Sequence, residues 1–328
     1  MFAMPEAGNA EVSPEVSVVI PTFARPELVT RAVRSALAQT VENIEVVVVI
    51  DGPDEASVAA LAEIADERLR VVPLTEQGGA QNARNTGVRE ARAAWTAMLD
   101  DDDEWMPRKL EVQLAAAARA DAASPIVATR LINRTPRAEL IMPRRLPAPG
   151  EPLSEYFTVR RGLFHGDGFI QTSTIMAPTE LFRRVPFTPG VRRMQELDWT
   201  LRALAEEDVD LVYTSDALVL WHTDEDRPRI SAETPWQSQL DWLIRSRPLM
   251  TPRAYAALMM SVVSSMAAPT HSPKIAKTIL KEARRNGRPG LIDYVTFAQI
   301  WLIPQDLRRG LRDRILKRGK ANKAVSGD

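Results

Sequence analysis

The chain of 328 residues contains no cysteine. This absence excludes disulfide bonds, thiolate metal ligands and cysteine nucleophiles, and it fits a cytosolic protein. A secretory signal is not expected, because no N-terminal segment combines basic residues with a hydrophobic stretch. Long hydrophobic runs are missing as well. The most apolar later segment, residues 254–269, is too short and too rich in serine to span a bilayer.

An overall excess of one charge is also absent, because 42 Lys and Arg residues face 43 Asp and Glu residues. The net charge of −1 argues against nucleic acid as a partner. The charge is nevertheless uneven, since residues 270–328 hold fourteen basic and five acidic side chains, a net charge of +9. The length predicts two lobes, or one domain with an appendage.

Short β-branched runs alternate with segments of helical periodicity in the first third of the chain. This alternation predicts an α/β fold with a mostly parallel sheet and helices on both faces. Ligands of such sheets bind beyond the carboxyl ends of the strands. Residues 1–15 are expected to be flexible, and the Pro- and Arg-rich residues 136–152 are expected to form a loop. Strands are predicted at 16–21, 44–50, 69–74 and 95–99, and helices at 26–40 and 55–65. Residues 78–94 are predicted to be a glycine-led loop that enters a third helix.

Four consecutive aspartates, Asp100 to Asp103, follow the fourth predicted strand. Carboxylates this close together repel one another. One interpretation is that they cap a helix opened by Pro107, where acidic residues favour the helix dipole. Capping uses one or two carboxylates, whereas a divalent cation would relieve the repulsion among all four. Oxygen ligands suit Mg²⁺ or Mn²⁺.

Four segments, VSVVIPTFARPELVTRAVRSALAQT, EVVVVIDGPD, GGAQNARNTGV and MLDDDDEWMPRKL, occur in the order typical of one enzyme family. Over residues 16–225 the chain resembles the inverting family 2 glycosyltransferases of GT-A fold. The resemblance implies metal-dependent transfer of a sugar from a nucleotide-sugar, commonly a UDP-sugar, to a hydroxyl acceptor by direct displacement. It also implies a role in bacterial polysaccharide, glycolipid or glycosylated metabolite synthesis.

The resemblance implies a catalytic domain at residues 16–235. Its Rossmann-like nucleotide-sugar-binding half would cover residues 16–110 and its acceptor half residues 111–235. Residues 236–328 would then form a basic, helical C-terminal region. This region is expected either to contact an anionic membrane surface on the cytoplasmic face or to serve as a helical lid or homodimer arm.

The metal motif DxD of the family corresponds to Asp100 and Asp102, which implies bound Mn²⁺ or Mg²⁺ with Asp102 as the direct ligand. His222 is expected near the metal, or else is a core or rim residue. Nucleotide-sugar contacts are implied for Pro21, Thr22, Arg25, Asp51, Arg84, Asp100 and Asp101. The alternatives are ordinary loop chemistry for Thr22 and Arg25, an Asx turn for Asp51, and a solvated helix position for Arg84.

The general base is predicted in the segment FTPGVRRMQELDWTLRALAEE, which resembles the family pattern EDxDxWxR. Glu196 occupies the place of the catalytic aspartate and Asp198 that of the second acid. Because Glu replaces Asp, the base is predicted to be Glu196 with Asp198 as the alternative; both are otherwise first-turn helix acids. Residues 168–187 are predicted to form a strand lining the acceptor side, with contacts from Gln171, Thr172 and Ser173.

Two other classes of function are alternatives to a glycosyltransferase. A sugar nucleotidyltransferase also combines an α/β sheet with acidic metal ligands, but its glycine- and arginine-rich loop is missing after residues 16–21. A non-catalytic nucleotide-sugar-binding member of the fold would retain the sheet and lose the acids. The acceptor is expected to be a sugar, a lipid-linked molecule or another small molecule.

Overall fold

The computed structural model describes residues 13–136, 138–162, 167–225 and 235–303. Contacts divide the chain into two compact units. The sheet unit comprises residues 1–141, 171–190 and 206–225, and the helical unit comprises residues 142–170, 191–205 and 226–328. This division groups two internal segments with the C-terminal helices, and the predicted boundaries at residues 110 and 235 stay predictions. The N-terminal segment expected to be flexible lies mostly outside the described residues.

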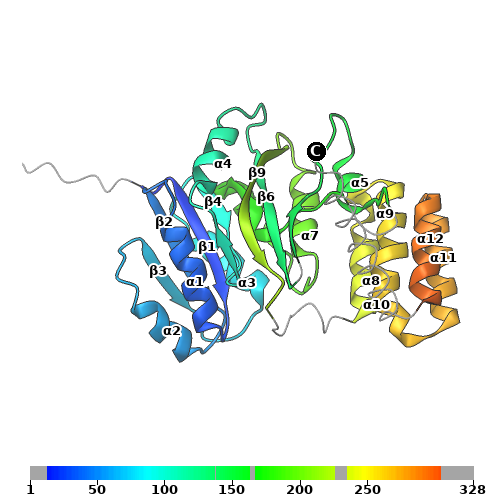
Figure 1. Ribbon diagram of the computed structural model, residues 1–328, viewed down its shortest axis with the longest axis horizontal. Coiled ribbons are helices and arrows are strands. Elements are labelled where there is room, and N and C mark those ends of the chain that lie inside the picture. The colour runs from blue at the N-terminus through cyan, green and yellow to red at the C-terminus, as the bar shows by residue number, and fades with distance from the viewer. Residues whose placement is uncertain (1–12, 137, 163–166, 226–234, 304–328) are drawn as a thin grey trace, which may run out of the picture. The chain divides into compact units, whose positions relative to one another are not determined.

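Within the described residues of the sheet unit, nine strands form one mixed sheet (Figure 1). The strand order is β3-β2-β1-β4-β8-β6-β9-β5, and β7 pairs with β6. The four N-terminal strands pair in parallel, as predicted, while β8 and β5 pair antiparallel to their neighbours. The strands are β1 (Val16–Thr22), β2 (Ile44–Ile50), β3 (Leu69–Pro73), β4 (Trp95–Met98), β5 (Asp103–Trp105), β6 (Ile126–Thr135), β7 (Ala138–Met142), β8 (Ile175–Pro178) and β9 (Leu211–His222).

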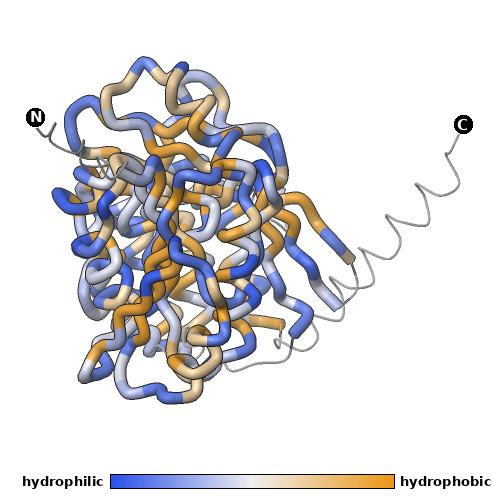
Figure 2. The backbone as a smooth tube through the Cα atoms, turned by 90° about the vertical axis from the view of Figure 1, so that its left-hand side faces the viewer, coloured by the Kyte–Doolittle hydropathy of each residue, from blue (hydrophilic) through white to orange (hydrophobic). Residues whose placement is uncertain are grey.

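The helices of the sheet unit cover the apolar central strands. Every residue of β1 and β2 is buried, and long apolar runs appear orange in Figure 2. Helix α1 has proline at its first position and buries Val29, Ala32, Val33 and Ala36, which recur at helical spacing. Burial of one valine side chain contributes about 1.5–3 kcal/mol. The helices are α1 (Pro26–Leu37), α2 (Glu55–Ala62), α3 (Ala80–Glu90), α4 (Lys109–Ala117) and α6 (Thr179–Arg184), with a 3₁₀ turn η1 (Thr172–Thr174).

The helical unit has its own hydrophobic core. The apolar segment 254–269 becomes a nearly continuous buried helical run made of α9, a π-helical turn η4 and α10. Among the described residues, no helix is both long and apolar enough to cross a membrane. The elements are α5 (Leu153–Thr158), α7 (Gln195–Ala203), α8 (Trp236–Arg245), η3 (Arg247–Leu249), α9 (Pro252–Leu258), η4 (Met259–Val263), α10 (Ser264–Ala267), η5 (Ala268–Thr270), α11 (Pro273–Asn286) and α12 (Leu291–Leu302).

Two local predictions are wrong. Residues 168–187, predicted as one strand, form the turn η1, the short strand β8 and the helix α6. The Gln171 side chain accepts from the Ser173 N–H, and the Thr174 hydroxyl donates to the Gln171 carbonyl, so polar side chains favour a turn over a strand. Residues 136–152, predicted as a loop, contain β7, which is held by pairing with β6 rather than by its own sequence.

The packing of α3 onto β1 allows no side chain at Gly87. A Cβ atom there would lie 2.3 Å from the buried Val19 Cγ1. We therefore expect Gly87→Val to lower the free energy of unfolding by about 1–3 kcal/mol, the usual effect of overpacking. Urea denaturation measures this change. Gly162→Val is the matched control, because nothing lies within 4 Å of the Cβ built there. An equal loss in both variants would contradict this account of Gly87.

Candidate active site

The candidate site lies where β1, β2 and β4 end. Because these neighbouring strands run parallel, their carboxyl ends meet at one edge of the sheet. The Asp51 N–H donates to the Thr22 carbonyl at 2.9 Å, so the ends of β1 and β2 stay in register. The chain after β4 continues directly into Asp100. The polar residues at the ends of these three strands therefore lie at one edge of the sheet.

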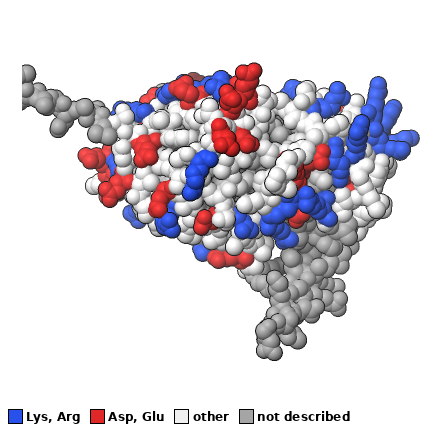
Figure 3. All heavy atoms as spheres, turned by 90° about the horizontal axis from the view of Figure 1, so that it is seen from above, with Lys and Arg blue, Asp and Glu red and all other residues white. Residues whose placement is uncertain are grey.

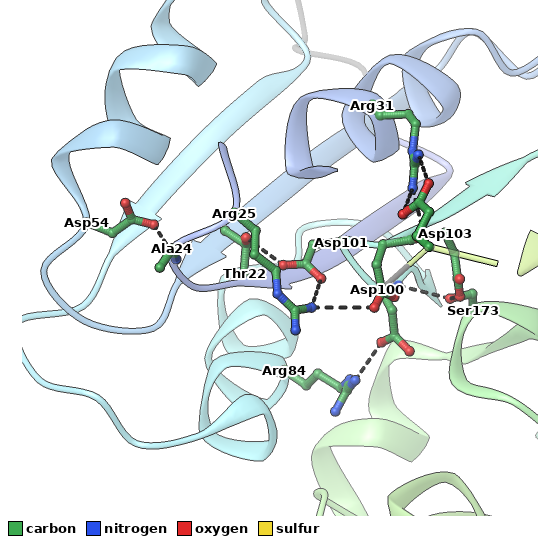
Figure 4. A network of polar contacts seen from close by, with 12 residues as sticks. Thr22, Ala24, Arg25, Arg31, Asp54, Arg84, Asp100, Asp101, Asp103 and Ser173 are labelled. Carbon is green, nitrogen blue, oxygen red and sulfur yellow. Dashed lines mark hydrogen bonds and ion pairs between the residues drawn. The ribbon is translucent and has the colours of Figure 1, made fainter. Parts of the chain in front are cut away.

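Two arginines approach the aspartates from different elements (Figure 4). Arg25 Nη1 donates to Asp101 Oδ1 at 3.1 Å and to Asp102 Oδ2 at 3.4 Å. Arg84 Nη2 donates to Asp100 Oδ1 at 2.5 Å. Arg84 is only 6% exposed, so the alternative of a solvated helix position is wrong. Charge-assisted hydrogen bonds of this kind offset the repulsion among neighbouring carboxylates.

A third arginine, which the sequence did not single out, belongs to the same network. Arg31 Nη2 donates to the Asp102 carbonyl at 3.1 Å, and its Nη1 donates to Glu225 Oε1 at 2.6 Å. Thr22 adds a neutral donor, since its hydroxyl donates to Asp101 Oδ2 at 2.8 Å. Three arginines thus lie beside four aspartates, which reduces the net charge of the cluster.

Asp103 points inward and is fully buried. Its Oδ2 accepts from the Ser173 hydroxyl at 2.6 Å and from Gln171 Nε2 at 2.7 Å. Ser173 also accepts from the Asp100 N–H at 2.9 Å. Gln171 and Ser173, with buried Thr172 between them, therefore hold the aspartates in place. Their predicted contact with the acceptor stays a prediction.

Burial changes the acidity of this cluster. Burial and the nearby Asp102 carboxylate raise the pKa of Asp101 to about 6. Burial, together with Asp102 and Asp100, raises the pKa of Asp103 well above its usual range. Burial therefore makes the ionised form of Asp103 less favourable than it is for an exposed aspartate. A divalent cation beside these oxygens would favour the ionised form instead.

The cluster has the donor set of a divalent cation site. Oxygens of Asp100, Asp102 and Asp103 lie within 4.8 Å of one another, the one such group among the described residues. Asp103 Oδ1 is buried and has no hydrogen-bond partner. A purely carboxylate donor set suits Mg²⁺ or Mn²⁺. The residues therefore fit the predicted metal, with Asp103 added to the predicted pair Asp100 and Asp102.

The capping interpretation of the aspartates is wrong. Helix α4 begins at Lys109, two residues after the predicted Pro107, and its N-cap residue Arg108 provides no side-chain cap. Asp103 instead belongs to β5, which pairs with β9. The aspartates therefore connect β4 to the paired strand β5, and they do not begin a helix.

His222 lies at the end of β9 but outside the three-carboxylate group. Its Nε2 lies 2.7 Å from Glu104 Oε1, and its Nδ1 lies 3.6 Å from Glu225 Oε1. The ring is 5% exposed, so it is held among acidic side chains beside the candidate metal ligands. Direct contact of His222 with a metal stays a prediction.

Asp51 fixes the loop that precedes α3. Its two carboxylate oxygens accept from the Gly78 N–H at 2.9 Å and the Gly79 N–H at 2.8 Å. The Asx-turn alternative is wrong, because the carboxylate bonds across the site rather than within its own turn. Since Arg84 lies in the second turn of α3, Asp51 indirectly positions it. Contacts of Asp51, and of Pro21 in β1, with a nucleotide stay predictions.

The two acids predicted as general base differ in their surroundings. Asp198 is 5% exposed, and its Oδ2 accepts from Arg202 Nε at 3.0 Å and Nη2 at 2.9 Å. Its Oδ1 accepts from Trp242 Nε1 at 2.8 Å. Glu196 is half-buried in the first turn of α7, two residues after Met194, which has a left-handed backbone conformation. Asp198 thus has a structural role within the helical unit.

A family model described as "Glycosyl transferase family 2" matches residues 17–185, more than half of the chain. Over 115 residues the chain is 39% identical to the succinoglycan biosynthesis protein ExoO of Rhizobium meliloti, covering 35% of this chain and 32% of that protein. Over 100 residues it is 31% identical to the Escherichia coli UDP-Glc:alpha-D-GlcNAc-diphosphoundecaprenol beta-1,3-glucosyltransferase WfgD, covering 30% and 40% of the two chains. The chain thus spans about a third to two-fifths of these two relatives.

A solved structure shares the fold. The crystal structure of Staphylococcus aureus TarS 1-349 in complex with UDP-GlcNAc has a TM-score of 0.58 to this chain. The likeness covers 90% of this chain and 92% of that one, at 15% sequence identity. At this low identity the comparison supports the GT-A arrangement of sheet and helices, as predicted from the sequence.

The side chains of Gln171 and Ser173 should be required for tight cation binding. In Ser173→Ala or Gln171→Ala, Asp103 loses a donor, and a hydrogen bond to a charged group contributes about 1.5–3 kcal/mol. We therefore expect the affinity for Mn²⁺ to fall about tenfold or more, measured by isothermal titration without nucleotide. Thr172→Val is the matched control in the same turn. Unchanged Mn²⁺ affinity in folded Ser173→Ala would contradict this role.

Proposed function

Since the chain belongs to glycosyltransferase family 2, we propose that it transfers a sugar from a nucleotide-sugar to a hydroxyl acceptor with inversion at the anomeric carbon. The observation that carries the proposal is the group Asp100, Asp102 and Asp103 at the carboxyl ends of parallel strands. Arg25 and Arg84 lie beside this group. An acidic cation site next to guanidinium groups suits a diphosphate.

The donor is proposed to be a UDP-sugar. Support comes from the names of two proteins similar to this chain: S. aureus TarS was crystallised with UDP-GlcNAc, and E. coli WfgD is named for UDP-Glc. The planar guanidinium groups of Arg25 and Arg84 can each bind a phosphate through two hydrogen bonds. Thr22 and Asp51, at the ends of β1 and β2, are proposed to contact the base or ribose.

A divalent cation, Mn²⁺ or Mg²⁺, is proposed to bind Asp100, Asp102 and Asp103. When bound, it supplies positive charge where the leaving diphosphate gains negative charge. Gln171 and Ser173 keep the carboxylates of this site at fixed positions. Asp103 Oδ1 is buried and has no hydrogen-bond partner among the described residues, so a bound cation would satisfy this oxygen.

Glu196 is proposed as the general base that takes the proton from the acceptor hydroxyl. The alternative, Asp198, already accepts hydrogen bonds from Arg202 and Trp242, so both of its carboxylate oxygens take part in structural contacts. Asp198 then serves as a positioning residue that anchors α7. Direct attack by the activated hydroxyl on the anomeric carbon forms one glycosidic bond and breaks the bond to the diphosphate, so the configuration inverts.

The acceptor is proposed to be a lipid-linked or soluble sugar of a bacterial polysaccharide, glycolipid or glycosylated metabolite, and the reaction is proposed to take place in the cytoplasm. The names of ExoO and of the B. subtilis protein TuaG, "Putative teichuronic acid biosynthesis glycosyltransferase", support a polysaccharide. The name of WfgD specifies a diphosphoundecaprenol-linked acceptor. Residues Gln171 to Ser173 are proposed to lie near the acceptor as well as to hold the aspartates.

Incubation with UDP-glucose or UDP-GlcNAc and Mn²⁺ tests the proposed reaction. Release of UDP, by transfer or slow donor hydrolysis, is the expected result. Formation of UTP and a sugar 1-phosphate when pyrophosphate is added would instead support a sugar nucleotidyltransferase. Metal-dependent binding of each donor without any turnover, also in the presence of candidate acceptors, would support a non-catalytic nucleotide-sugar-binding protein.

Asp102→Asn should abolish Mn²⁺-dependent binding of UDP while the protein stays folded, because the substitution removes one negative charge from the cation site. Fluorescence or calorimetric titration of UDP with and without Mn²⁺ measures this effect. Asp216→Asn, at an exposed aspartate of β9, is the matched control. If Asp102→Asn retained Mn²⁺-stimulated binding, the assignment of this ligand would be wrong.

Glu196→Gln should retain UDP binding and lose transfer by about 10²-fold or more, the range of general-base contributions. The rate of UDP release with an acceptor that supports wild-type turnover measures this loss. Asp198→Asn is expected to lower the unfolding temperature more than Glu196→Gln, because its partners Arg202 and Trp242 are affected. An inactive, stably folded Asp198→Asn beside an active Glu196→Gln would reverse the two roles.

A further inference from the structure

Helix α12 exposes an apolar face. Leu291 is 81% exposed, Tyr294 38% and Leu302 79%, and they lie on one side of the helix at intervals of three and eight residues, together with exposed Ala298. Leu291 and Leu302 are the two most exposed large hydrophobic residues among those that the structure describes. The sole charged residue of α12, Asp293, is buried. An apolar helix face of this kind indicates a binding surface.

The preceding helix α11 exposes a face of the opposite character. Its basic residues and the one just after it are all exposed and recur at helical spacing, while Ile279 and Ala283 are buried on the other side. Figure 3 shows basic side chains gathered on the part of the molecule that carries these helices. No ion pair forms at these cations among the described residues. They are Lys274, Lys277, Lys281, Arg284, Arg285 and Arg288.

The exposed faces of α11 and α12 lie opposite the sides that pack against one shared core. Helices α11 and α12 are joined by residues 287–290, and each packs its buried side against η4 and α10. The Asp293 carboxylate caps α12 by accepting from the Gly290 N–H at 2.8 Å and pairs with Arg253, which fixes the turn between the helices. A shallow hollow along the apolar face is lined by Tyr294, Val295, Ala298, Gln299, Leu302 and Ile303.

We propose that the exposed faces of α11 and α12 bind an anionic lipid surface. The lysines and arginines of α11 lie at the phosphate groups, and Leu291, Tyr294 and Leu302 enter the boundary between headgroups and acyl chains. Anionic lipid surfaces bind proteins that present basic side chains to the phosphate groups and apolar side chains to the acyl boundary.

Charge decides between a lipid surface and a second copy of the chain. A symmetric dimer buries the same patch of both copies, so an interface that included the α11 face would bring the six cations of each copy together. An anionic bilayer offers opposite charge to α11 and an apolar layer to α12 in one surface. The proposal concerns binding alone and does not rest on the proposed catalytic function.

Cosedimentation of the full-length protein with vesicles tests the proposal. We expect binding to vesicles made of equal parts phosphatidylglycerol and phosphatidylcholine, and little binding to phosphatidylcholine alone. Raising the salt from roughly 0.1 to 1 M shortens the Debye length from about 10 to about 3 Å and should release the protein. Lys277→Glu with Lys281→Glu should lower the apparent affinity about tenfold or more. Leu291→Ser with Leu302→Ser should lower it as well.

Two matched double variants serve as controls. Arg92→Glu with Arg119→Glu changes the net charge by the same amount at exposed positions of the sheet unit, and Val58→Ser with Ile141→Ser removes exposed apolar side chains there. Both controls should bind vesicles like the wild type. Absence of vesicle binding by the wild type, or equal losses in test and control variants, overturns the proposal. It is also overturned if light scattering shows a dimer that Leu291→Ser with Leu302→Ser separates while vesicle binding is unchanged.

Discussion

The repulsion among four consecutive carboxylates is the constraint around which the sheet unit is organised. Two unit charges 4 Å apart interact with about 4 kcal/mol at an effective dielectric constant of 20. The protein offsets this energy with Arg25, Arg31 and Arg84 and with hydroxyl and amide donors. Burial and the neighbouring carboxylates still raise the pKa of Asp103. The same oxygens that are costly to hold together form the one described group suited to a divalent cation.

The elements around the aspartates depend on one another. Asp51 holds the Gly78–Gly79 turn from which α3 starts, and the absence of a side chain at Gly87 lets α3 pack closely on β1. Together these contacts position Arg84 against Asp100. A change at Gly78, Gly79 or Gly87 would therefore alter the charge around Asp100 through the position of Arg84.

The first third of the fold could be predicted from the sequence, because β1 to β4 and α1 to α3 follow local apolar periodicity. The family motif also predicted Asp100, Asp102, Arg25 and Arg84 as site residues. The sequence did not reveal the anchoring by Gln171 and Ser173, the part of Arg31, or β7. The contacts of Gln171, Ser173 and Arg31 join distant segments: Ser173 and Asp103 are 70 residues apart, and no local pattern records such a contact. Strand β7 instead pairs with β6, which directly precedes it, but its proline- and arginine-rich surroundings indicated a loop.

The strand pairing of Asp103 also has a consequence in time. Asp103 pairs with Trp221 through β5 and β9, so the clustered carboxylates reach their final places only after β9 has been synthesised. At about 5–20 residues per second, this strand follows Asp103 by roughly 6–24 seconds. During synthesis the four aspartates therefore remain without the pairing of β5 to β9 until most of the sheet unit has been made.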